Sequence, residues 1–95
     1  MPAEQPDKVV RITMQDGIPV PDQDPVDVRK NDQKLRWTAD FDFRITVDGY
    51  TDLNYSHGSE YTCKTGSFNS ERRYKYTISA NGVDNDPMID VKPAP

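Results

Sequence analysis

The stretch Phe41-Asp42-Phe43-Arg44-Ile45-Thr46-Val47-Asp48 carries the clearest structural signal in the chain. Its apolar and polar residues alternate over eight positions, and a β-strand turns successive side chains to opposite faces of a sheet. An α-helix would instead repeat its apolar residues every three or four positions. The stretch therefore predicts a β-strand with one buried face and one face in water.

The same two-residue period recurs on both sides of this stretch. It places apolar residues at Val10, Ile12 and Met14, at Val26 and Val28, at Leu35 and Trp37, at Tyr74, Tyr76, Ile78 and Ala80, and at Ile89 and Val91. Turn-forming pairs such as Asp16-Gly17 and Asn81-Gly82 separate these segments. Short strands at regular spacing are typical of a sandwich. We predict an all-β, single-domain, antiparallel or mixed β-sandwich of about seven short strands. Its predicted core is Ile12, Val28, Leu35, Trp37, Phe43, Ile45, Tyr76, Ile78 and Val91.

Length and composition favour one small folded domain. Val, Ile, Leu and Phe make up 18 of the 95 residues, just under the roughly 20% at which disorder becomes an alternative. Disorder also requires a high net charge, and here it is only -4. We expect a loose N-terminal end over residues 1–7, the sandwich over 8–92 and a loose C-terminal end over 93–95. The proline-rich segment 17–25 predicts an irregular connection or a broken edge strand.

The charge pattern argues against two classes of partner. A sequence pI near 4.8 argues against nucleic acid, which requires clustered Lys and Arg. The one dense basic run, Arg72-Arg73-Tyr74-Lys75, alternates faces in a strand and predicts a solvated strand start. No stretch approaches the ~20 apolar residues of a membrane span, and residues 1–7 lack the pattern of a signal peptide. If the chain is complete, we expect a cytoplasmic protein. The single cysteine, Cys63, agrees with a reducing compartment.

Three segments resemble a known fold family. Residues 24–38 resemble the second and third strands of cupredoxin-like domains, and residues 74–79 and 88–91 resemble the last two strands of that fold. The layout from Val9 to Lys92 is also similar to small uncharacterised bacterial domains of the DP-EP family, a resemblance that implies a fold and no known activity. The choice between cupredoxin-like and immunoglobulin-like topology stays open.

The cupredoxin resemblance implies a blue-copper site of two His, one Cys and an axial Met. The chain contains one histidine, His57, and the position near the end of the Tyr74 strand that would carry the cysteine holds Ile78 and Ser79. Met88 falls where the axial ligand would lie, but alone it is better explained as packing at the core edge. We therefore predict a cupredoxin-like sandwich that lacks the copper ligands, with no metal and no cofactor.

Catalytic motifs are absent from the sequence. Nothing places His57 beside Cys63 or a serine, and one His with one Cys is too few ligands for zinc. We expect Cys63 to be a small buried thiol. The Asp22-Gln23-Asp24 and Asp84-Asn85-Asp86 segments leave weak calcium binding open, although bonds to their own backbone in turns are the simpler interpretation. We predict that the protein is not an enzyme.

The segment from Gly49 to Ser70 suggests a binding surface, because it combines polar loop residues with several aromatic rings. The candidate binding residues are Tyr50, Asn54, Tyr55, His57 and Tyr61. The expected partner is an unknown protein or a small polar ligand, not nucleic acid or membrane, and the chain is expected to be a monomer or a weak homo-oligomer. Two alternatives stay open: the tyrosines point inward from one or two further strands, or the chain is a small enzyme or metal-binding domain using His57 and loop carboxylates. Exposure of Tyr55 and Tyr61 would favour binding.

Overall fold

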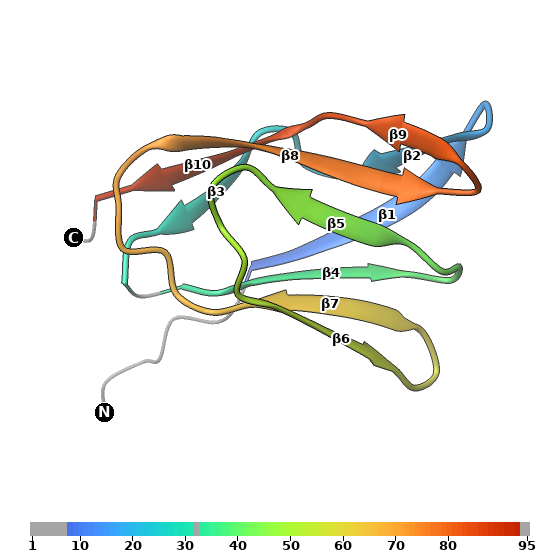
Figure 1. Ribbon diagram of the computed structural model, residues 1–95, viewed down its shortest axis with the longest axis horizontal. Coiled ribbons are helices and arrows are strands. Elements are labelled where there is room, and N and C mark those ends of the chain that lie inside the picture. Colours follow the sequence, from blue (N-terminus) through green and yellow to red (C-terminus); the bar gives the residue numbers. More distant parts are fainter. Residues whose placement is uncertain (1–7, 32, 94–95) are drawn as a thin grey trace.

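The computed structural model describes residues 8–31 and 33–93, which form two β-sheets packed face to face (Figure 1). The strands are β1 (Lys8–Gln15), β2 (Ile18–Pro21), β3 (Val26–Arg29), β4 (Leu35–Ala39), β5 (Arg44–Val47), β6 (Leu53–His57), β7 (Tyr61–Thr65), β8 (Arg73–Ala80), β9 (Val83–Asn85) and β10 (Met88–Lys92). One sheet has the order β2-β1-β4-β7-β6, and the other has the order β3-β10-β8-β5 with β9 beside β8. The predicted all-β sandwich is confirmed, with ten short strands rather than about seven.

The core fills the space between the sheets, as the two-residue period predicts. All nine predicted core residues are buried, each with no more than 5% of its surface exposed. Trp37 on β4 packs against Tyr76 on β8 with ring centroids 5.1 Å apart, so it joins one sheet to the other. Burial raises the pKa of the Tyr76 hydroxyl.

Both sheets are mixed. The β1–β4 and β3–β10 pairs are parallel, and the remaining strand pairs of the described chain are antiparallel. Two hairpins use the predicted turns: Asp16-Gly17 joins β1 to β2, and Asn81-Gly82 joins β8 to β9. All four turn residues have positive φ, which is the requirement of the tight two-residue hairpin turn.

Three local expectations concern the start of the Phe41 strand, the segment 17–25 and the two ends of the chain. The strand expected from Phe41 begins only at Arg44, and Phe41 is half-buried before it. Within the segment 17–25, Ile18–Pro21 form the edge strand β2, which agrees with the edge-strand alternative and not with an irregular connection there. An edge tolerates Pro19 and Pro21 because one side of the strand needs no ladder bonds. The expected loose ends at 1–7 and 93–95 lie outside the described residues, except for Pro93, which follows β10 and is exposed.

The described part of the chain has no helix that is both long and apolar enough to cross a membrane.

Candidate functional site

The polar-aromatic segment forms a β-hairpin. β6 pairs antiparallel with β7 from Leu53 opposite Thr65 to His57 opposite Tyr61. The expected loop is therefore wrong for Tyr55, His57 and Tyr61, which lie on two further strands. The tyrosines of these strands are not fully turned inward, because Tyr55 is 44% exposed and Tyr61 is half-buried. β6 could not be recognised from the sequence because it shows no apolar alternation. The strand lies at a sheet edge, and four of its five residues are exposed.

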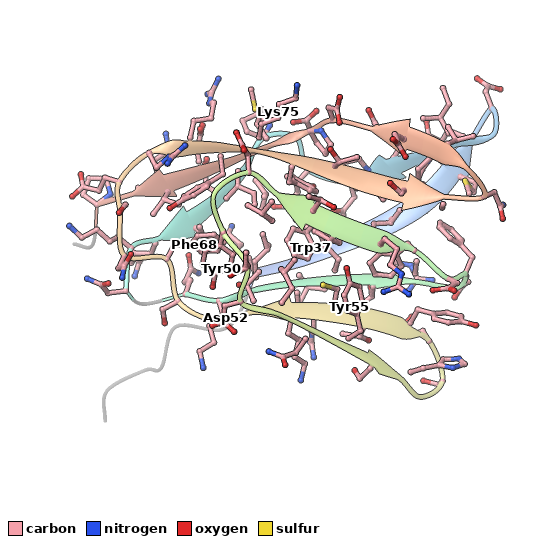
Figure 2. All side chains as sticks on the ribbon, in the orientation of Figure 1. Trp37, Tyr50, Asp52, Tyr55, Phe68 and Lys75 are labelled. Atoms are coloured by element: carbon pink, nitrogen blue, oxygen red, sulfur yellow. The ribbon has the colours of Figure 1, made fainter. Side chains whose placement is uncertain are left out.

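Tyr55 crosses from the β6 edge to the second sheet. Its hydroxyl accepts a hydrogen bond from the Ile45 N–H (2.8 Å) and donates one to the Ile45 carbonyl (3.0 Å). Figure 2 shows the Tyr55 side chain between the β6–β7 hairpin and β5. The Arg44 guanidinium lies 5.4 Å from the Tyr55 ring centroid, within cation–π range. Partial burial raises the pKa of the Tyr55 phenol, but 44% of the residue's surface remains exposed.

An open groove of about 280 Å³ lies between β5 and β6. Its lining comes from the start of β5 and from the β6–β7 hairpin: Asp42, Phe43, Arg44, Tyr55, Ser56, His57, Tyr61 and Thr62. The His57 and Tyr61 rings stack with centroids 3.9 Å apart and planes only 9° from parallel. The groove thus combines apolar ring surfaces with one carboxylate and one guanidinium, which is the composition of a recognition site.

Cys63 on β7 is fully buried and lies opposite Tyr55 in the register. Burial raises the pKa of its thiol to about 11. A thiol with this pKa is protonated at neutral pH and is a poor nucleophile. The arrangement matches the expected small buried thiol.

The structure brings together three of the five predicted site residues: Tyr55, His57 and Tyr61 line the groove. Tyr50 lies elsewhere, stacked on Phe68 with centroids 4.5 Å apart, and Figure 2 shows this pair away from Tyr55. Asn54 is exposed and pairs with Lys64 in the register; alternation along β6 turns its side chain to the face opposite that of Tyr55.

Sequence reasoning missed Asp42 and Arg44 and assigned Phe43 to the core alone. These residues precede or begin β5, which belongs to the other sheet, so no local pattern links them to the hairpin. One available signal was Gly58 between His57 and Tyr61, since a three-residue hairpin loop would have paired the two rings.

The aspartate-rich segments make cross-strand bonds instead of the expected bonds to their own backbone. The Asp22 carboxylate accepts from the Arg11 N–H and that of Asp24 from the Met88 N–H. Asp84 accepts from the Ser79 hydroxyl, and Asp86 accepts from the Thr77 hydroxyl. Within residues 8–31 and 33–93, no three His, Cys, Asp or Glu side chains gather where a metal ion could be held.

Comparisons with protein-family models, with curated proteins and with solved structures gave no match to this chain. The resemblance to cupredoxin-like and DP-EP domains therefore stays a prediction, and any function must be argued from the groove.

Proposed function

We propose that this protein is a non-enzymatic binding module whose contact surface is the groove between β5 and β6. The observation that carries the proposal is the convergence of Tyr55, His57 and Tyr61 on one open groove, opposite Phe43 and Arg44. Flat rings supply contact area at a low entropic cost because they have few rotatable bonds. The groove brings aromatic rings and both signs of charge together.

The lining favours a polar ligand that has a flat apolar part, either a small molecule or a side chain of a partner protein. Such a group could lie against the stacked His57 and Tyr61 rings. Arg44 and Asp42 stand at the margin as one donor and one acceptor, and the described residues offer neither of them a salt-bridge partner. Charges without a salt-bridge partner at the margin of a groove set the orientation of a ligand more than its affinity.

The test is a screen of polar aromatic fragments followed by ¹H–¹⁵N chemical-shift mapping. We expect shifts to concentrate on residues 42–44, 55–57 and 61–62. His57→Ala and Tyr61→Ala should weaken fragment binding by about tenfold, the effect of removing one ring contact of roughly 1.4 kcal/mol.

Asn54→Ala is the matched control because Asn54 belongs to the same strand but turns to the opposite face. It should leave fragment binding unchanged. Shifts confined to β3 and β10, or equal losses in the Asn54 and His57 variants, would contradict the proposed groove.

A further inference from the structure

The outer edge of β6 carries backbone groups without partners. The Gly58 N–H donates to the Glu60 carbonyl (3.2 Å) and the Gly66 N–H donates to the Asp52 carbonyl (3.3 Å), which fixes the residues of β6 that bond to β7. In an antiparallel ladder these alternate, so Leu53, Tyr55 and His57 direct their N–H and C=O groups away from β7. The Leu53 N–H is occupied by the Thr51 carbonyl (2.9 Å). No other described residue occupies the groups of Tyr55 and His57 or the Leu53 carbonyl.

The other edge strands carry protection that β6 lacks. β2 contains Pro19 and Pro21, β3 contains Asp27 and Arg29, β9 has only three residues, and the Ile45 backbone of β5 is capped by Tyr55. Prolines, charges, short length and covering groups are the means by which proteins prevent unwanted strand pairing. β6 reads Leu-Asn-Tyr-Ser-His, has no proline, no Lys and no bulge in its register, and is therefore open to pairing.

We infer that β6 pairs antiparallel with β6 of a second copy of this chain, about a twofold axis at Tyr55. In this register Tyr55 lies opposite Tyr55 of the second copy, and the two residues exchange both of their N–H···O=C bonds. Each His57 N–H then donates to the Leu53 carbonyl of the other copy. The inference goes beyond the proposed function, because it uses the backbone edge and not the side chains of the groove.

The charges along the edge favour a second copy as the occupant. Along β6 itself, pairing about Tyr55 places only Leu53, Asn54, Tyr55, Ser56 and His57 across the interface, so no two like charges of the paired strands lie opposite each other in an otherwise acidic protein. The nearest lysine, Lys64, lies one strand further in. The two copies of Lys64 would then be three strand spacings apart, about 14 Å, beyond the ~8 Å screening length at physiological salt.

The contact is small, so its strength should depend on concentration. A five-residue edge belongs to the low end of interface sizes, where association is weak. Sedimentation from ~10 μM to ~1 mM should show the mass rising from 10.8 kDa toward twice that value. The amide protons of Tyr55 and His57 should gain exchange protection over the same range. Protection at every concentration would mean that part of the same chain covers β6, and would overturn the inference.

Two variants at His57 separate the backbone from the side chain. His57→Pro removes an outward N–H and leaves the β6–β7 bonds intact, whereas His57→Ala removes only the imidazole. We expect His57→Pro to weaken association by at least about tenfold, since two symmetry-related hydrogen bonds are lost. His57→Ala should associate like the parent chain. Equal association of the Pro and Ala variants would overturn the inference.

A second pair of variants tests the register and does not depend on proline being tolerated. Asn54 lies opposite Ser56 of the second copy, so Asn54→Glu with Ser56→Glu places like charges across the interface. Asn54→Glu with Ser56→Lys places opposite charges there and should associate at least about fivefold more tightly than the double Glu variant. Equal affinity of the two would refute the twofold register. A monomer at ~1 mM would refute the dimer while leaving fragment binding in the groove as a separate result.

Discussion

β5 and β6 are the edge strands of two different sheets on the same side of the sandwich. The backbone groups of Ile45 at the β5 edge have hydrogen-bond partners, whereas those of Tyr55 and His57 at the β6 edge have none within the described chain. On β5, the Tyr55 hydroxyl occupies both the N–H and the C=O of Ile45, and the Tyr50 N–H occupies the Val47 carbonyl. On β6, the outward groups of Tyr55 and His57 have no partner among the described residues. The group that seals β5 belongs to β6. One side chain, Tyr55, therefore satisfies the Ile45 backbone groups at the edge of β5, whereas the edge of β6 and the groove beside it stay open.

The largest expected effect is on the β5 side. Phe43→Ala should lower the free energy of unfolding by about 3–5 kcal/mol, because a ring with 3% exposure leaves a cavity in the core. Urea denaturation measures the change. His57→Ala on the exposed β6 edge should change the same quantity by less than about 0.5 kcal/mol. A loss below about 1 kcal/mol for Phe43→Ala would show that both edges are equally dispensable.

The next effect concerns pH and the thiol behind Tyr55. Folding raises the pKa of Cys63 to about 11, so the folded state holds its proton more tightly than the unfolded state. The stability this provides is present below the unfolded pKa of about 8.5 and is lost as pH rises toward 11. Between pH 8 and pH 11 the parent chain should lose about 3 kcal/mol more than Cys63→Ala. Parallel pH profiles for the two chains would show that the Tyr55 side of the groove admits water to Cys63.

A smaller effect is expected from the two hydrogen bonds between the Tyr55 hydroxyl and the Ile45 backbone. Tyr55→Phe keeps the ring and removes the hydroxyl, so the Ile45 N–H and C=O lose their partner. We expect a loss of about 1 kcal/mol in unfolding free energy and faster exchange of the Ile45 amide proton.

Tyr61→Phe is the matched control, because the Tyr61 hydroxyl has no hydrogen-bond partner among the described residues. Its stability should remain within about 0.5 kcal/mol of the parent chain. An unchanged exchange rate of the Ile45 amide proton in Tyr55→Phe would mean that the Tyr55 hydroxyl does not protect the β5 edge, so β5 and β6 would not differ in this respect.

The core and the site were predictable to different degrees, for physical reasons. The alternation of Phe43, Ile45 and Val47 reports burial of one strand face, and burial produces that pattern wherever a strand faces the core. β6 is a sheet-edge strand with four of its five residues exposed, so Tyr55 and His57 lie in a stretch without an apolar period. The chemical interest of their rings could be recognised from composition, but their secondary structure could not.

The groove itself was beyond a local pattern. It exists because the chain leaves β5 in one sheet and enters β6 in the other, and sheet membership depends on pairing between distant strands, such as parallel β1 and β4. Asp42 and Arg44 therefore could not be assigned to the same site as Tyr61. Tyr55 was likewise expected to contact a ligand, whereas its hydroxyl bonds to the backbone of Ile45 at the edge of β5.

The smallest expected effect asks whether Arg44 helps to hold the Tyr55 ring across the gap. The guanidinium lies 5.4 Å from the ring centroid, and a cation–π contact at an exposed site contributes about 0.5 kcal/mol. A double-mutant cycle of Arg44→Gln and Tyr55→Leu should give a coupling energy of that size by urea denaturation. The cycle of Arg44→Gln with Tyr61→Leu should give a value near zero, because Arg44 has no described ring contact with Tyr61. Equal coupling energies in both cycles would mean that Arg44 acts through long-range electrostatics and not through a contact with the Tyr55 ring. Coupling confined to Tyr55 would mean that Arg44 of β5 stabilises the Tyr55 side chain that bonds to the β5 backbone.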